Sequence, residues 1–237
     1  MQILADYHTH TVYSHGKGTI EDNVREAISK GIKTIGISDN GYKHMTYGIK
    51  YKDIYKMREE IDSLKLKYKN IDILLGIECN ILDDSGNIDV DENILKVVDY
   101  IMAGYHFGST PTSIKGVINH CDNYLFKTKK AKQYNTKAIT NAMRKHNIFA
   151  ITHPGDKGEV DIVEIAKVAK ETDTRLEING GHGFLSVKQI EAIKSIKNKY
   201  IIGSDAHVPE NVGNFDLAMK IIEEANLDVS LVENIKI

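Results

Sequence analysis

Short apolar runs alternate with longer amphipathic stretches along this chain of 237 residues, and this order limits the fold more than any other feature. Each apolar run is rich in Ile, Leu or Val and has the length of a buried strand, whereas the stretches between them repeat apolar residues at helical spacing. Such alternation is typical of βα units around a parallel sheet. It predicts seven strands, at residues 2–7, 33–38, 72–77, 99–104, 148–152, 174–178 and 200–204.

Amphipathic segments in the gaps predict the helices. Residues 19–30 begin at Thr19, a helix-capping residue, and stop before Gly31, a residue type that commonly follows a helix. Similar patterns predict helices at residues 53–68, 128–146, 161–172, 186–196 and 214–225. Residues 107–127 show the weakest periodicity and include Pro111, so we predict an extended loop over the barrel mouth there. The even composition predicts one domain over residues 1–237, and the alternation of strands and helices places that domain in the α/β class.

Net charge and cysteine content narrow the class of protein. A formal net charge of −2 gives no global reason for binding a polyanion, although a local basic face would still allow a nucleic acid partner. Cys79 and Cys121 are too few for a disulfide framework, which indicates free thiols in a reducing compartment. No leader-like segment and no window near the ~20 apolar residues of a membrane helix stand out. We therefore expect a cytoplasmic protein with no membrane partner.

Residues of metal-binding types stand at the ends of most predicted strands. His8 and His10 end the first strand two residues apart, and Asp205 and His207 repeat that spacing after the last, so each pair shares one face of an extended segment. Asp6 lies one step deeper and is expected to accept a ring N–H from a histidine. The complete set of candidate ligands is His8, His10, His15, Glu78, His106, His153, Asp205 and His207.

These eight residues are expected to be neighbours in space, because a parallel barrel gathers the carboxyl ends of its strands into one bowl. A lone histidine after an apolar strand is usually structural, but here five of the seven strands end in His, Glu or Asp. Mixed imidazole and carboxylate ligands suit Zn, Mn or Fe better than Ca, which prefers oxygen ligands alone. The sequence therefore predicts a metal centre.

Seven motifs resemble, in the same order, those of the PHP (polymerase and histidinol phosphatase) family, and look closest to its stand-alone phosphatase branch. They are Asp-Tyr-His8-Thr-His10-Thr, His15-Gly, Ser-Asp-Asn40-Gly, Gly-Ile-Glu78, Gly-Tyr-His106, Thr-His153-Pro-Gly and Gly-Ser-Asp205-Ala-His207. The resemblance spans nearly the whole chain. It implies a distorted seven-stranded (βα)7 TIM-like barrel with a multinuclear centre of two or three divalent ions (Zn, Mn or Fe).

The resemblance also implies how the ligands divide. One metal would be held by His8, His10, Glu78 and Asp205, a second by Glu78, His106 and His153 with Glu78 bridging, and a third would be surrounded by His15, Asn40 and His207. The departure is Asn40, where the family usually has histidine. An amide oxygen is a poorer ligand than imidazole for Zn or Fe, so the residues leave open whether a third ion binds, whether His44 substitutes, or whether Asn40 contacts substrate phosphate instead.

Two cations bridged by a carboxylate are suited to phosphoester hydrolysis, since they activate a shared water and stabilise both oxygens of an in-line displacement. Our hypothesis is that the metal-bridging hydroxide attacks phosphorus. Glu78, Asp205 and His207 are the catalytic candidates, with Asp205 or His207 passing a proton to the leaving alcohol. His15, Asn40 and Asn179 are the substrate-binding candidates, and Asn179 is preferred to His182 for lining the site because it ends a strand.

The sequence is consistent with three functions. A phosphatase acting on a small phosphorylated substrate is favoured, histidinol phosphate being one substrate of the family that the chain resembles. The alternative is a 3′–5′ exonuclease or nucleotide phosphohydrolase that uses the same centre. An inactive, metal-holding interaction module is the third, and it would be favoured by the loss of several ligands, whereas only Asn40 departs.

Overall fold

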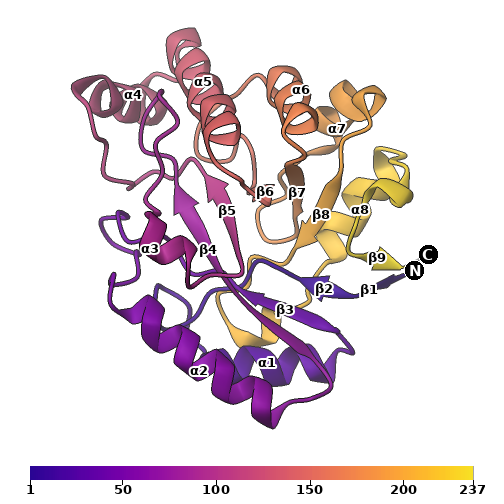
Figure 1. The fold of residues 1–237 in the computed structure, drawn as a ribbon. Coiled ribbons are helices and arrows are strands. Elements are labelled where there is room, and N and C mark those ends of the chain that lie inside the picture. Colours follow the sequence, from indigo (N-terminus) through magenta and orange to yellow (C-terminus); the bar gives the residue numbers. More distant parts are fainter. Residues whose placement is uncertain (237) are drawn as a thin grey trace.

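Seven parallel strands form a nearly closed barrel in the computed structural model, which describes residues 1–236 (Figure 1). Neighbours in the sheet are also neighbours along the chain, and all six adjacent pairs are parallel. The strands are β2 (Ala5–Asp6), β3 (Thr34–Ile37), β4 (Asp72–Asn80), β5 (Tyr100–Gly104), β6 (Ala150–Ile151), β7 (Arg175–Asn179) and β8 (Tyr200–Gly203). This confirms the distorted α/β barrel predicted from the sequence.

The barrel approaches closure at its carboxyl rim. β2 and β8 are the two ends of the sheet order, and just beyond them Thr9 and Ala206 form a parallel bridge. The His10 amide donates to the Ala206 carbonyl at 2.8 Å, which ties together the two segments that carry His10 and Asp205. The contact that joins the segments after the first and last barrel strands therefore also brings His10 and Asp205 together in the candidate site.

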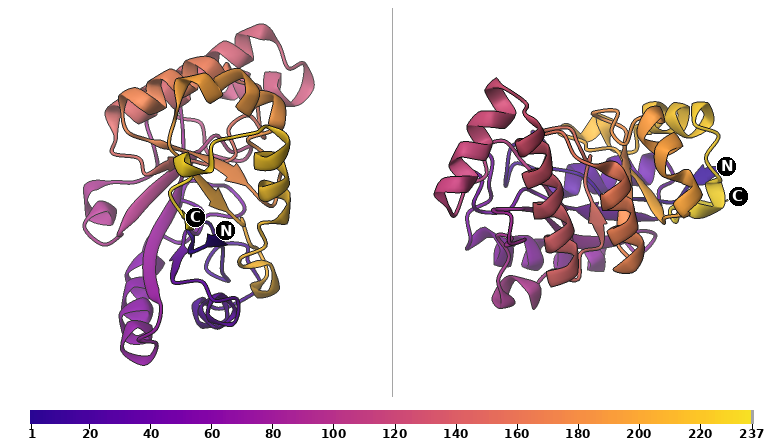
Figure 2. Two further views of the ribbon diagram at one scale, coloured as in Figure 1. Left: turned by 90° about the vertical axis from the view of Figure 1, so that its right-hand side faces the viewer. Right: turned by 90° about the horizontal axis from the view of Figure 1, so that it is seen from above.

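Helices surround the strands on the outside (Figures 1 and 2). They are α1 (Ile20–Ser29), α2 (Asp53–Lys67), α3 (Glu92–Leu95), α4 (Ile114–Leu125), α5 (Lys129–Lys145), α6 (Ile162–Glu171), α7 (Val187–Ile193) and α8 (Asp216–Glu224), with short 3-10 turns η1 (Lys194–Ile196), η2 (Pro209–Asn211) and η3 (Val229–Leu231). The predicted cap of α1 is present, since Thr19 and Asp22 form a reciprocal capping box. Fully buried Ile35, Ile37 and Leu75 from the strands join the main hydrophobic core. None of the helices within residues 1–236 is long and apolar enough to cross a membrane.

The first predicted strand, residues 2–7, is two short strands with different partners. β1 (Gln2–Ile3) pairs antiparallel with β9 (Ile235–Lys236), so the two ends of the chain lie side by side (Figures 1 and 2). Only β2 belongs to the barrel. The sheet hydrogen bonds of β6 cover two residues where five were predicted, whereas β4 continues to Asn80 and therefore contains Glu78.

The loop predicted for residues 107–127 is wrong for its second half, which is helix α4. Ser113 caps this helix by accepting the Gly116 amide. The side chains that face the protein are polar, Asn119 and Asn123, while apolar ones such as Ile118 and Leu125 are each 62% exposed. Apolar periodicity identifies a helix by its buried apolar stripe, and here that stripe faces outward, so the pattern did not reveal the helix.

Candidate metal centre

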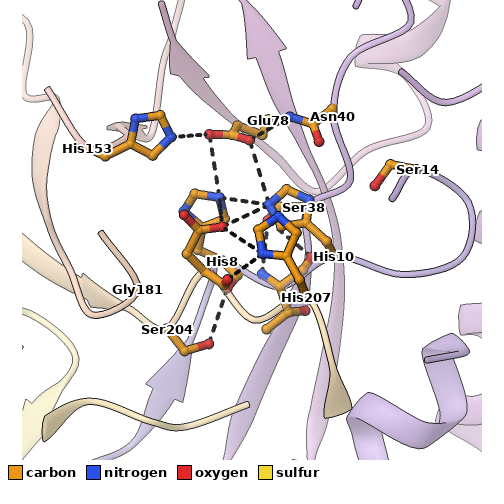
Figure 3. Close-up of polar contacts among 12 residues, drawn as sticks. His8, His10, Ser14, Ser38, Asn40, Glu78, His153, Gly181, Ser204 and His207 are labelled. Atoms are coloured by element: carbon orange, nitrogen blue, oxygen red, sulfur yellow. Dashed lines mark hydrogen bonds and ion pairs between the residues drawn. The ribbon is translucent and has the colours of Figure 1, made fainter. Parts of the chain in front are cut away.

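A pocket of about 380 Å³ opens at the carboxyl ends of the barrel strands and collects most of the predicted ligands. It is lined by His10, His15, Asn40, His44, Tyr47, Glu78, His106, Phe107, His153, Lys157, Gly181, His182, Asp205, His207 and Asn211. His8 lies beneath these residues and is fully buried. All eight candidate ligands, which come from both ends and the middle of the sequence, therefore meet in one place, as Figure 3 shows for several of them.

The deepest group of ligands joins His8 and His10, which follow the first barrel strand, and Asp205, which follows the last, to Glu78. Nε2 of His8 and Nε2 of His10 lie 3.2 Å apart, and His10 Nε2 is 3.1 Å from Asp205 Oδ1. His8 Nε2 is 3.4 Å from Glu78 Oε1 and 3.5 Å from Asp205 Oδ1. Ligand atoms of His8, His10 and Glu78 all lie within 4.8 Å of one another, close enough to share one metal ion.

The second group shares Glu78 with the first. His106 Nε2 and His153 Nε2 each lie 3.0 Å from Glu78 Oε1 (His153 to Glu78 is drawn in Figure 3). Glu78 is 2% exposed, and its other oxygen, Oε2, is 3.7 Å from His10 Nε2. One carboxylate thus faces two sets of imidazoles, which is the geometry of a bridging ligand.

The third group consists of His10, His15 and His207, with the ring Nε2 atoms of His15 and His207 2.5 Å apart. Asn40, expected beside them, instead donates its amide Nδ2–H to Glu78 Oε2 at 2.9 Å (Figure 3). Asn40 Oδ1 is buried and has no hydrogen-bond partner among the described residues. Asn40 therefore uses its amide NH2 group to hydrogen-bond the bridging carboxylate, and its Oδ1 oxygen is left without a partner.

The backbone at two of the strand ends is strained. His153 has φ 27° and Asp205 has φ 54°, values that non-glycine residues rarely adopt. Such conformations cost about 1–3 kcal/mol each and cluster at functional sites, where the surrounding structure enforces them. The strain at these two positions supports a functional role for both side chains.

Glu177 supports both groups from below. His8 Nδ1 lies 2.6 Å from Glu177 Oε1, while Oε2 accepts the His153 amide at 2.9 Å and Asn179 Nδ2–H at 3.0 Å. Gly203 makes room for this contact, because a Cβ there would lie 2.1 Å from Glu177 Oε1. A carboxylate on Nδ1 fixes the histidine tautomer and leaves Nε2 free to bind metal.

Two sequence predictions about supporting residues differ from the structure. Asp6, expected to accept a histidine ring N–H, accepts the backbone amides of His8, Ser204 and Gly213, and Glu177 takes the ring contact. Asn179, expected to line the pocket, is fully buried below it and donates to Asp205 Oδ2 at 3.1 Å. The short strand β2 ends before His8, so Asp6 and the ring of His8 do not follow one regular extended face.

Residues that the prediction ranked low or did not consider also line the pocket. His182 Nε2 reaches Asp205 Oδ2 at 3.2 Å, so its loop enters the site although Asn179 was preferred. The Tyr47 ring stacks on His15 at 4.5 Å and on His44 at 5.1 Å. Only the Gly-Gly sequence before His182 hinted at a close approach; Tyr47 lies in a segment without a readable pattern.

Burial and contacts between the candidate ligands shift their pKa values and so set which side chains are charged. Burial raises the pKa of Glu78, but His106 and His8 outweigh it and hold that pKa well below its usual range. Burial also raises the pKa of Asp205, but His8 and His10 outweigh it and hold that pKa well below its usual range. Burial, reinforced by His10 and His207, lowers the pKa of His15 to about 3. The carboxylates are therefore ionised and His15 is neutral at pH 7. Burial lowers the pKa of His8 and of His153, but Glu177 acting on His8 and Glu78 acting on His153 outweigh it and raise both, so a cation that binds these rings would displace their protons.

The donor set fits divalent transition metals. Imidazoles, which give up any ring proton when they bind a cation, and an ionised, shared carboxylate are the ligands that Zn, Mn and Fe accept. His8 Nδ1–H donates to Glu177 and His106 Nδ1–H donates to Asn80 Oδ1 at 2.9 Å, and these outer hydrogen bonds orient the rings. Asp89 in turn accepts Asn80 Nδ2–H at 2.7 Å. The residues can thus hold two cations that share Glu78, an arrangement suited to polarising phosphate oxygens and water.

Comparisons with known proteins agree with this geometry. A protein named as a probable phosphatase from Thermoanaerobacter sp. (strain X514) is 33% identical over 249 residues, covering 99% of this chain and 91% of the relative. A probable phosphatase from Clostridium acetobutylicum is 30% identical over 250 residues, with the same coverage. The crystal structure of histidinol phosphate phosphatase from Lactococcus lactis, complexed with zinc, L-histidinol and phosphate, shares the fold with a TM-score of 0.64, 16% identity and coverage of 95% of each chain. The model of the PHP domain matches residues 6–180, and the chain therefore belongs to the PHP domain family.

Proposed function

We propose that this member of the PHP domain family is a metal-dependent phosphatase that releases phosphate from small phosphomonoesters. The observation that carries the proposal is Glu78, whose carboxylate lies between two groups of buried imidazoles. Relatives that span nearly the whole chain are named phosphatases, which supports the same activity for residues 1–237 acting as one domain. The small, polar pocket favours a small phosphorylated substrate over nucleic acid.

We assign the first metal to His8, His10, Glu78 and Asp205, and the second to Glu78, His106 and His153. When bound, such ions lower the pKa of water and stabilise charge on phosphate oxygens. Zinc is the first candidate, with manganese and iron as alternatives, because the ligands combine imidazole and carboxylate. Asn40 fixes the orientation of Glu78 through its 2.9 Å hydrogen bond, and its unpaired Oδ1 is the group left for a substrate or water hydrogen.

His15 and His207 are proposed to contact the phosphate. Both line the pocket, and His207 is one-third exposed, whereas the oxygens of Asp205 are engaged by His10, Asn179 and His182. A general acid must be free to exchange its proton, so we assign proton transfer to the leaving alcohol to His207 and a ligand role to Asp205. Burial and His10 lower the pKa of His207, so its ring must take up a proton before it can donate one. Glu78, Asp205 and His207 remain the proposed catalytic set.

The test is phosphate release from a panel of small phosphomonoesters after loading with Zn, Mn or Fe, run beside 3′-end removal from single-stranded DNA. We expect turnover of the small esters and loss of more than about 100-fold in Glu78→Gln, since even residues that only orient a ligand contribute about 10–100-fold. Glu171→Gln, on the exposed face of α6, is the control and should keep full activity. DNA degradation without ester hydrolysis would favour the nuclease alternative. No hydrolysis of any phosphoester, in this chain or in Asn40→His, would overturn the proposal.

A further inference from the structure

Exposed apolar side chains gather on one segment of this protein. Among residues 1–236, the part of the chain that the structure describes, fifteen large apolar side chains are exposed, and seven of these lie within residues 107–126. The seven, which we call the α4 face, are Phe107, Ile114, Val117, Ile118, Tyr124, Leu125 and Phe126. Single exposed apolar residues are ordinary on protein surfaces, but a contiguous group indicates a surface that contacts a partner.

Helix α4 turns its apolar side outward because its polar side is used inside the protein. Its exposed apolar residues recur at intervals of three and four positions, so they form one stripe along the helix. The opposite side holds Asn119 and Asn123, which donate to Asn135 Oδ1 at 2.8 and 3.0 Å and fix the helix in this orientation. α4 lies at the edge of the molecule beside α5 (Figure 1). A surface helix normally buries its apolar stripe, so this orientation indicates a partner outside the chain.

Lysines flank the α4 face. Residues 107–133 contain five lysines and a single acidic residue, Asp122, although the whole chain has a net charge of −2. Lys115, Lys127 and Lys130 are all exposed. The Asp122 carboxylate is already engaged, since it accepts the Thr128 amide at 3.1 Å and also the Thr128 hydroxyl. The α4 face therefore combines apolar surface with positive charge.

An anionic lipid bilayer matches both properties. A helix that lies in the surface of a bilayer buries its apolar stripe among the lipid chains, while lysines at its borders extend to the head groups. Anionic head groups attract such lysines. A second copy of this chain that paired α4 with α4 would bury the stripe, but it would bring no free carboxylate to the lysines because Asp122 is bonded to Thr128. Charge complementarity therefore favours the bilayer over self-association.

We propose that the α4 face binds the surface of a bilayer that contains anionic lipids. Phe107 belongs to this face and also lines the pocket of the metal ligands, so binding holds that pocket beside the lipid surface. The expectation of no membrane partner rested on the length that a spanning helix needs, and a helix that lies on the surface does not need that length. The proposal is independent of the phosphatase activity.

The test is co-sedimentation of the full chain with two kinds of vesicle, one of phosphatidylcholine alone and one of equal parts phosphatidylcholine and phosphatidylglycerol. We expect binding to the mixed vesicles that weakens at high salt, and little binding to phosphatidylcholine alone. Ile118→Ser combined with Leu125→Ser should weaken binding more than about tenfold, because the stripe loses two apolar side chains. Lys127→Gln combined with Lys130→Gln should weaken it about 10–30-fold.

A matched control changes the same residue types elsewhere. Leu66→Ser combined with Lys69→Gln alters two exposed residues at the end of α2, which lies far from α4 (Figure 1), and should bind as the unmodified chain does. Cys121 of α4 adds a local measurement, because it is exposed whereas Cys79 is fully buried. An environment-sensitive dye on Cys121 should shift its emission to the blue with mixed vesicles only.

Several results would overturn the proposal. They are equal binding to both kinds of vesicle, no binding to either, unchanged affinity in one of the two α4 double variants, and binding without a shift of the Cys121 dye. A dimer in light scattering that Ile118→Ser with Leu125→Ser abolishes, together with no vesicle binding, would assign the α4 face to a second copy instead. The substituted side chains are all exposed, so the variants should remain folded, as circular dichroism would show.

Discussion

Glu177→Gln tests whether the buried carboxylate below the metal centre controls metal binding. Gln has nearly the same size as Glu, so the change removes charge and replaces one acceptor oxygen by an NH2 donor. If the amide oxygen faces His8 Nδ1, the NH2 group meets the His153 amide and Asn179 Nδ2, which are both donors. If the amide is turned round, His8 must carry its proton on Nε2, the atom directed at Glu78. Either arrangement leaves the site with an unsatisfied group or a blocked ligand.

The expected loss follows from the contacts. A hydrogen bond to a charged group contributes about 1.5–3 kcal/mol, and residues that orient a metal-bound histidine typically contribute 10–100-fold in affinity, which is about 1.4–2.7 kcal/mol. Both free-energy ranges apply to the 2.6 Å contact between His8 Nδ1 and Glu177 Oε1, and the two ranges overlap. We therefore expect Kd for zinc to rise about 10–100-fold in Glu177→Gln.

The assay is competition for zinc against a chromogenic chelator at pH 7, supported by circular dichroism to show that the variant is folded. Glu171→Gln removes one charge from a pair with Arg144 on the surface and should leave Kd unchanged. A folded Glu177→Gln protein with the Kd of the unmodified chain would refute the argument that this carboxylate sets the tautomer of His8.

Three further changes probe other parts of the molecule. Removing the metal with a chelator should lower Tm by about 5–10 °C relative to protein at a metal concentration of 100 Kd. Binding at that concentration contributes ~2.7 kcal/mol, and each kcal/mol shifts Tm by about 2–4 °C in a domain of this length. A thermal scan that shows no shift would contradict metal binding to the folded state. Asn135→Leu removes one of the two acceptors of the Asn119 and Asn123 amides and leaves them the Tyr105 hydroxyl. We therefore expect α4 to loosen, residues 107–127 to be cut faster by protease, and the stability in urea to fall by about 1–3 kcal/mol. Unchanged cleavage would show that α4 is held by other contacts. Asn40→His should raise the metal content measured by elemental analysis from two ions per chain to three, and an unchanged content would show that Asn40 does not limit the third position.

Strand ends were predictable from the sequence, and the residues that support them were not. His106 and His153 follow short apolar runs, and because parallel strands end at one rim, their position in the chain was enough to bring them near His8. Glu177 lies inside an apolar strand and meets His8 from 169 residues away, so no local pattern marks it. Helix α4 was not predicted for a related reason. Its buried positions are Gly116, Asn119 and Asn123, and the partners of the two asparagines lie elsewhere in the chain.

The distribution of charge explains why Asn40 matters. Glu78, Asp205 and Glu177 place their negative charge around His8, His10 and His153, whereas the third group adds to His10 only the imidazoles of His15 and His207. A third cation there would face two others at short range without a carboxylate of its own, and like charges in a buried site repel strongly. A phosphate dianion supplies the missing negative charge. We therefore expect this chain to take up a third ion only when phosphate is present, as measured by zinc titration with and without phosphate. Equal uptake in both titrations would contradict this account of the charges.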